Sequence, residues 1–343
     1  MISIIICSKC SQTDFKLLQN IQDTIGVDYE IVHIDNSQHK YSIFQAYNLG
    51  VERAKGEYLC FMHEDVVFHS HDWGKVVEFT LADDIVGAIG VAGGNVQLAD
   101  VDWRFCYETG YLHLLQGAYT IEENPKYYYA VKPKVSKGRE PLWQVVTLDG
   151  LWFCIRKELF RHIRFDEENF HDFHLYDSDI CMQINKLGKG VFITHDILME
   201  HKSIGLFTES YRESLHVFFK KWKDDLPMIR GLYVSAQDIE YLLSYAPKDF
   251  EERLSHDIKI RELNRVIALK KEGLPCRNYT DEEIALMDES AYKYRHKCIK
   301  DKQIPTSYVK DLVDEYRHSS FARRKFKLYY KYVWYRVIKR IGK

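Results

Sequence analysis

The sequence lacks any apolar run long enough to cross a membrane, and it lacks the pattern of a secretory leader. A membrane-spanning helix needs about 20 predominantly apolar residues, and no stretch of the 343 residues approaches that length. The chain opens directly on the apolar segment 2–7, without the charged segment and small-residue cleavage site of a signal peptide. We therefore expect a cytoplasmic protein.

Cysteine is present without a pattern, and charge of one sign is not in excess. The 8 cysteines show no framework spacing, which favours reduced thiols. Cys7 and Cys10 have CxxC spacing, but no second pair completes a zinc site, so we interpret them as structural or incidental thiols. The net charge of -2 gives no field that would attract nucleic acid, and we expect no nucleic-acid partner.

Short apolar runs alternate with amphipathic segments over residues 1–95. The runs expected to form strands are 2–7, 30–34, 57–62 and 86–91, and the expected helices are 14–25 and 42–54. This alternation predicts an α/β fold with a mostly parallel, Rossmann-like sheet and helices on both faces. Ligands of such sheets bind beyond the carboxyl ends of the strands, so residues 7–9, 35–37 and 63–65 are the ones to examine.

Beyond Gly94 the pattern becomes less regular. Further strands are expected at 145–148, 152–155 and 191–194, with a helix over 176–187, and from about residue 207 the chain reads as helical and charged. We predict an α/β domain over 1–205 in two halves (about 1–95 and 96–205), a helical region over 206–319 and a separate basic helix over 320–343.

Carboxylates follow two of the expected strands. Asp65, in His63-Glu64-Asp65, is placed at a strand end where it could hold a divalent cation against a diphosphate. Asp35 ends an earlier strand, where a carboxylate could accept the ring N–H of uracil or thymine. An Asx turn is the competing interpretation of Asp35, and a satisfied strand-end histidine that of His63.

The order of these segments resembles family 2 glycosyltransferases with the GT-A fold. The phrase His63-Glu64-Asp65-Val66 is similar to a bacterial branch in which His replaces the first Asp of Asp-x-Asp. The chain departs from the family in two places: Cys7-Ser-Lys-Cys10 replaces a Pro/Thr-rich turn, and Tyr176-Asp177 replaces the usual Glu-Asp pair. The segments that carry the resemblance are 3–8, 31–37, 46–50, 54–58, 61–66, 148–150, 165–166, 176–181, Gly188 and His201.

The resemblance implies an inverting transfer of a sugar from a UDP- or dTDP-linked donor to a sugar or lipid-linked acceptor, in cell-surface polysaccharide or glycoconjugate synthesis. Asp177 is then the general base, with Asp179 as its rival. Asp65 and His201 would bind Mn²⁺ or Mg²⁺. The implied donor contacts are Ser8, Asp35, Asn48 and His63, and the implied acceptor contacts are Asp149 and Gly150. On this resemblance about residues 1–95 are the nucleotide-binding half of the GT-A domain and residues 96–205 its acceptor half.

Two alternatives to this function come from different classes of protein. A dehydrogenase would need G-x-G-x-x-G after the first strand, and a nucleotidyltransferase a basic glycine-rich loop, yet residues 7–12 contain no glycine. A non-catalytic GT-A-like scaffold that binds membrane and partners is the second alternative. Asp65, Asp177 and His201, which such a scaffold would not need, argue against it.

The C-terminal segment 321–343 has the composition of an interfacial helix. It carries 9 Lys or Arg residues and no Asp or Glu, and apolar residues such as Phe326, Tyr330, Val333 and Trp334 recur at helical spacing. We expect it to lie on an anionic membrane surface, which would hold the protein on the inner face of the cell membrane. Packing against its own domain or pairing in a homodimer are the alternatives.

We predict that the full chain floats with anionic liposomes and that a chain ending at Ser319 does not, because each cation near such a surface contributes about 1 kcal/mol. Equal flotation of the two chains would contradict the prediction, as would no binding of the full chain.

Overall fold

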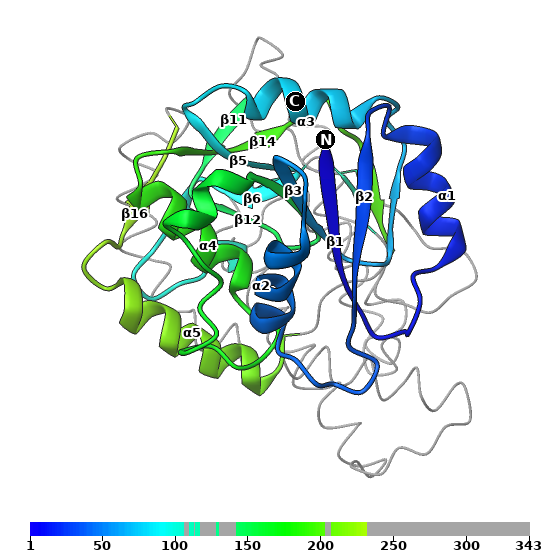
Figure 1. Ribbon diagram of the computed structural model, residues 1–343. Helices are drawn as coiled ribbons and strands as arrows, with labels where there is room; N and C mark the ends of the chain where they lie inside the picture. The colour runs from blue at the N-terminus through cyan, green and yellow to red at the C-terminus, as the bar shows by residue number, and fades with distance from the viewer. Residues whose placement is uncertain (106–109, 113, 117–127, 130–141, 203–206, 232–343) are drawn as a thin grey trace, which may run out of the picture. The chain divides into compact units, whose positions relative to one another are not determined.

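A computed structural model describes residues 1–105, 110–112, 114–116, 128–129, 142–202 and 207–231 (Figure 1). Its main sheet has seven strands in the order β11-β14-β5-β13-β3-β1-β2. In chain order these strands are β1 (Ile2–Ser8), β2 (Tyr29–Asp35), β3 (Tyr58–Met62), β5 (Val86–Gly90), β11 (Leu142–Val145), β13 (Trp152–Arg156) and β14 (Gly190–Thr194).

The main sheet is mostly parallel, as the sequence predicts. β2, β1 and β3 pair in parallel, and so do β5 and β14. β13 lies between β3 and β5 and runs antiparallel to both, while β11 runs antiparallel to β14 at the edge. The expected strand 145–148 is divided: β11 belongs to the main sheet, and β12 (Thr147–Leu148) pairs with a different strand.

Helices cover both faces of this sheet. Successive side chains of a strand point to opposite faces, and the apolar side chains of β1 are buried on both. Ile2, Ile4 and Ile6 of β1 share one core with residues of α1 (Phe15–Thr24) and α3 (Trp73–Leu81). On the opposite face Ile5 meets α2 (Ile43–Arg53), and a Cβ at Gly50 would lie only 2.4 Å from Ile5 Cγ2. Glycine at position 50 thus lets α2 lie directly on the sheet.

Local sequence signals explain where these helices begin. The side chain of Asp14 accepts a hydrogen bond from Lys16 N at the start of α1. Ser42 and Gln45 form a reciprocal capping box at the start of α2. The remaining helical elements are α4 (Tyr176–Lys186), α5 (Glu209–Trp222) and the 3-10 turns η1 (Trp103–Phe105) and η2 (Lys157–Arg161).

Three smaller sheets surround the carboxyl ends of the main strands. They have the strand orders β10-β9-β15-β4, β12-β6-β8 and β16-β7. Their strands are β4 (Val66–Phe68), β6 (Ala92–Gly94), β7 (Val96–Gln97), β8 (Gly110–Leu112), β9 (Leu114–Gln116), β10 (Tyr128–Tyr129), β15 (Met199–His201) and β16 (Met228–Ile229). The pairing of β15 with β4 places His201 opposite Val66, which brings a late segment beside residues 63–65.

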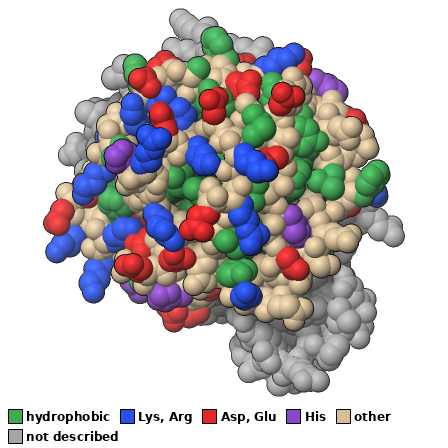
Figure 2. Space-filling model, in the orientation of Figure 1, with side chains coloured by type: hydrophobic (Ala, Val, Ile, Leu, Met, Phe, Trp, Pro, Cys, Tyr) green, Lys and Arg blue, Asp and Glu red, His purple; other side chains and the backbone are tan. Residues whose placement is uncertain are grey.

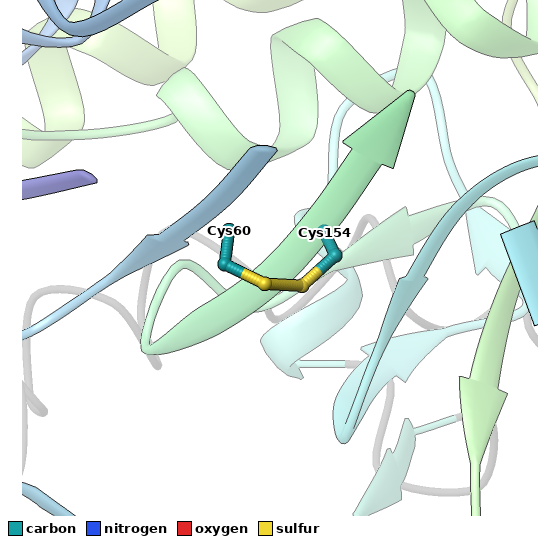
Figure 3. The surroundings of a disulfide bond; sticks show 2 residues. All are labelled: Cys60 and Cys154. Atoms are coloured by element: carbon teal, nitrogen blue, oxygen red, sulfur yellow. A yellow bond between two sulfur atoms is a disulfide. The ribbon is translucent and has the colours of Figure 1, made fainter. Parts of the chain in front are cut away.

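Cys60 and Cys154 form a disulfide, so the expectation of reduced cysteines is wrong for this pair (Figure 3). They are direct partners in the antiparallel pairing of β3 with β13, and their Cα atoms lie 4.2 Å apart. The two cysteines are 94 residues apart in sequence, so no local pattern predicts their contact. The contact forms because β13 pairs with β3. Cys7, Cys10 and Cys181 are free thiols.

The C-terminal part of the chain is described only as far as residue 231. Within that limit the expected helical region 206–319 contains α5 and β16, and β16 pairs with β7 of the preceding domain. The remainder of this region and the expected basic helix 320–343 lie outside the described residues. Among the described helices none is long and apolar enough to cross a membrane. Charged side chains of both signs are interspersed on the face shown in Figure 2.

Candidate functional site

The carboxyl ends of the central strands meet at one edge of the main sheet. Ser8 and Asp35 are direct partners at the ends of β1 and β2. Ile6 pairs with Met62, the last residue of β3, and His63 follows immediately. The parallel register therefore gathers the three segments that the sequence pattern selects.

A cluster of two histidines and one carboxylate lies at this edge. His63 Nδ1 is 3.4 Å from His201 Nε2, and His201 Nε2 is 3.4 Å from Asp65 Oδ1. The ligand atoms of all three residues lie within 4.8 Å of one another. Ligands that bind one cation at about 2.1 Å are separated from each other by roughly 3–4 Å. The two separations made by His201 Nε2 lie in this range and fit ligands of one divalent ion.

The donor set also fits such an ion chemically. Imidazole nitrogen combined with carboxylate oxygen suits Mn²⁺ and other first-row divalent metals, while Mg²⁺ prefers oxygen alone. Burial, with a further contribution from His201, lowers the pKa of His63 to about 4. At neutral pH the imidazole is therefore uncharged, as a metal ligand must be.

Tyr176, the first residue of α4, orients His63. His63 Nε2 lies 2.9 Å from the Tyr176 hydroxyl, and that hydroxyl donates to the Gly150 carbonyl at 3.2 Å. With its proton on Nε2, His63 donates to Tyr176 and leaves Nδ1 free to face Asp65 and His201. A hydrogen bond from the second ring nitrogen is the usual way in which proteins fix a ligating histidine.

Gly150 is required at its position by this contact. A Cβ there would lie 2.0 Å from the Tyr176 hydroxyl, an impossible distance. Any side chain at position 150 would displace Tyr176 and, through it, His63. Gly150, expected only as an acceptor contact, therefore also supports the arrangement of residues on the metal side.

Ser8 and Asp35 are engaged in local hydrogen bonds beside the cluster. The Ser8 hydroxyl donates to the Glu64 carboxylate, a residue that the sequence analysis did not select. Asp35 is exposed, and its Oδ1 accepts from Ser37 N at 2.9 Å. That backbone N–H lowers the pKa of Asp35. This is the Asx turn expected as one interpretation.

Asn48 makes its described contacts away from the cluster. Its amide donates to the Phe165 carbonyl at 2.9 Å and accepts from Phe165 N at 3.2 Å, and the side chain is buried. These bonds join α2 to the segment before α4. Its expected contact with a donor nucleotide stays a prediction.

Arg104 binds three carboxylates on the opposite side of Gly150. Its Nη2 donates to Asp177 Oδ2 at 2.6 Å, its Nε lies 3.5 Å from Asp149 Oδ2, and its Nη1 lies 3.4 Å from Asp102 Oδ1. Asp177 Oδ2 also accepts from Gly150 N at 2.7 Å. The candidate base and the candidate acceptor carboxylate therefore share one cation.

The environments of Asp177 and Asp149 differ. The Asp177 side chain is only 4% exposed, and burial raises its pKa although Arg104 opposes the rise. The Asp149 side chain is 29% exposed; burial acts to raise its pKa as well, but Arg104 and His201 bring it below its usual range.

Asp179, the rival candidate for the base, is occupied by structural partners. Its carboxylate is fully buried and accepts from Trp222 Nε1 at 2.8 Å and from Gln183 Nε2 at 2.8 Å. Lys221 Nζ lies 2.7 Å away and also binds Asp166. These contacts attach α4 to α5.

Three residues of the site were not predicted from the sequence: Arg104, Tyr176 as a partner of His63, and Glu64. Arg104 lies in an irregular aromatic segment and reaches Asp177 across 73 positions of sequence. Its one local signal is Asp102, whose spacing from Arg104 allows the backbone N–H of Arg104 to bind the Asp102 carboxylate. Tyr176 could have been found from its place beside Asp177.

A family model described as "Glycosyltransferase like family" matches residues 2–222 of the chain. No curated protein matches the chain. The solved structures similar to it include GalNAc-T7 with UDP, GalNAc and Mn²⁺, at 13% identity and a TM-score of 0.44, covering 75% of this chain. The chain spans 57% of the length of that protein.

Two further solved structures have a similar degree of likeness. The mannosyltransferase PcManGT from Pyrobaculum calidifontis, in complex with GDP-Man and Mn²⁺, has 13% identity and a TM-score of 0.41, over 91% of this chain and 87% of its own. A197 from STIV has 13% identity and a TM-score of 0.34, over 60% of this chain and 86% of its own. At these scores the likenesses add nothing to the family match.

We predict that Arg104→Met lowers the free energy of unfolding by about 3–5 kcal/mol near pH 8, because it leaves buried carboxylates without their cation. Without Arg104 the folded-state pKa of Asp177 rises further above its unfolded value. The penalty is then full above that raised pKa and shrinks as the pH falls through it and Asp177 takes up a proton. Denaturant unfolding at pH 8 and pH 5 measures both effects.

Arg164→Met is the matched control, since Arg164 is 63% exposed and pairs only with Glu167 at i+3 in the described part of the chain. It should change stability by less than about 0.5 kcal/mol at either pH. Similar losses in the two variants, or a loss for Arg104→Met that grows at lower pH, would show that Arg104 does not neutralise the buried carboxylates.

Proposed function

The chain belongs to a glycosyltransferase-like family whose model covers residues 2–222, and we propose that it transfers a sugar, with inversion, from a nucleoside diphosphate to an acceptor hydroxyl. The observation that carries this proposal is the link between two groups of residues. The His63–Asp65–His201 cluster reaches Gly150 through Tyr176, and Gly150 N–H binds Asp177. The cluster that could hold a cation against a diphosphate is thus linked through Tyr176 and Gly150 to Asp177, the carboxylate that could accept the proton of an alcohol.

The donor would bind at the edge formed by β1, β2 and β3. His63, Asp65 and His201 would hold Mn²⁺ or Mg²⁺, which when bound offsets the negative charge that develops on the departing diphosphate. Asp35 is exposed at the end of β2, where its carboxylate would accept the ring N–H of uracil or thymine. This favours a UDP- or dTDP-linked sugar.

The acceptor would bind on the side of Asp149 and Asp177. Its hydroxyl oxygen forms the new bond to the anomeric carbon, the bond from that carbon to the diphosphate breaks on the opposite face, and the hydroxyl proton passes to Asp177. The pKa of Asp177 is raised by burial, which makes its carboxylate the stronger base of the two. Asp149 is more exposed and would accept a hydrogen bond from an acceptor hydroxyl.

The biological setting follows from the sequence resemblance. We propose a role in cell-surface polysaccharide or glycoconjugate synthesis, with a sugar or lipid-linked acceptor reached from the inner face of the membrane.

We expect Asp65→Ala to remove the metal-dependent part of nucleotide binding, at least ~10-fold in affinity, because two histidines alone lack the charge to hold the ion against a diphosphate. Calorimetry with UDP and dTDP, with and without Mn²⁺, measures this. The exposed Glu52 of α2 offers a control: Glu52→Ala should bind as the unmodified chain does. Metal-dependent affinity that survives in Asp65→Ala would remove Asp65 from the site.

Asp177→Asn should leave donor binding nearly unchanged while turnover falls by at least ~10²-fold, as for the loss of a general base. Release of nucleoside diphosphate from UDP- and dTDP-sugars in Mn²⁺ reports the turnover. Asp179→Asn is the comparison: it breaks a buried pair with Lys221, so it should lower the unfolding temperature while the folded fraction keeps its turnover. Full turnover in Asp177→Asn would exclude Asp177 as the base.

A further inference from the structure

Phe173 is an exposed aromatic residue at the edge of the candidate metal cluster. Its side chain is 44% exposed, its ring centroid lies 5.7 Å from that of His63 and 5.8 Å from that of Tyr176. A single exposed apolar side chain is common on protein surfaces. Ligand sites, however, combine apolar and aromatic surface with a few convergent polar groups, and Phe173 beside the cluster provides this combination. The other exposed large apolar residues described are Met1, Phe15, Phe79, Ile85 and Leu187, and among these residues only Phe173 has a ring contact with the cluster.

The backbone around Phe173 is fixed, which gives the ring a defined place. Leu175 is buried and adopts φ 65°, a left-handed conformation that costs a non-glycine residue roughly 1 kcal/mol. His174 packs against Tyr211 with ring centroids 5.3 Å apart, and its Nε2 lies 3.3 Å from Thr208 Oγ1. The residues on the C-terminal side of Phe173 are therefore held by α5 and by the core.

We propose that Phe173 is a stacking platform for the sugar ring of the donor, which deepens the function proposed above and rests on it. A pyranose ring has a face of C–H groups and a rim of hydroxyls. The face of an aromatic ring carries partial negative charge that attracts such C–H groups, and apolar area is removed from water at the same time.

Position selects the donor sugar as the occupant. His63 touches the ring of Phe173 and contributes one of the atoms that would hold the cation. A diphosphate on that cation places the sugar that it carries one bond further out, next to the ring. The hydroxyls of the sugar would then meet the polar residues of the site, while its apolar face covers Phe173.

The test compares bare nucleotides with nucleotide sugars. Affinities of UDP, dTDP and a panel of their hexose and N-acetylhexosamine conjugates are measured by calorimetry with Mn²⁺, for the unmodified chain, Phe173→Ala, Phe173→Tyr and Phe79→Ala. Phe79 is the matched control because it is also an exposed phenylalanine, 86% exposed, on α3. We expect Phe173→Ala to weaken the tightest-binding nucleotide sugar by about 5- to 10-fold and its bare nucleotide by less than about 2-fold.

Phe173→Tyr keeps the ring and should bind as the unmodified chain does, and so should Phe79→Ala. If Phe173→Ala lowers the affinities for nucleotide and nucleotide sugar by the same factor, or changes neither affinity, the stacking platform is refuted while the proposed function stands. If the unmodified chain shows no metal-dependent binding of any nucleotide in the panel, the proposed function fails, and this inference fails with it. Unfolding temperatures of the variants verify that each is folded.

Discussion

Two buried carboxylates in the first turns of α4 impose the arrangement of the whole site. Asp177 and Asp179 are each almost inaccessible to water, and a buried carboxylate is costly unless it is paired and hydrogen-bonded. No cation within α4 serves them in the described structure. Arg104 of η1 neutralises Asp177, and Lys221 of α5 neutralises Asp179. One segment that precedes α4 in sequence and one that follows it must therefore converge on this helix, and the site lies where they meet.

The same helix joins the two halves of the proposed chemistry. Tyr176 and Asp177 are consecutive residues: one orients His63 on the metal side, and the other binds Arg104 and Gly150 N–H on the acceptor side. Gly150 lies between them and bonds to both, so a shift of α4 would change the two sides together. This explains why one glycine, at the turn after β12, matters for both. It also gives the proposed base a fixed distance from the proposed cation without any direct contact between them.

Much of the fold could be predicted from the sequence, because the spacing of apolar residues and the turn-forming residues at the ends of elements depend only on neighbouring positions. The first strands and helices, the mostly parallel sheet and the gathering of Ser8, Asp35 and residues 63–65 at one edge all followed from alternating patterns. Asp65 and His201 could be anticipated as candidate metal ligands, whereas His63 was expected as a donor contact and joins the cluster only in the structure. The sequence could not show that β13 inserts antiparallel beside β3, which pairs Cys60 with Cys154. Nor could it show Arg104 reaching Asp177, since both contacts depend on long-range packing with no periodic signature.

The attachment of α5 to Asp179 determines where this chain can be divided into independently folding parts. The indole of Trp222 and the amine of Lys221 supply the hydrogen bonds that Asp179 needs, and the family match also ends at Trp222. A fragment that stopped at residue 205, the boundary suggested by composition, would keep every residue of the proposed chemistry and still leave this carboxylate buried without its cation. The smallest fragment expected to fold therefore extends through Trp222, the last residue of α5. A boundary for fusing or exchanging domains should lie after Trp222.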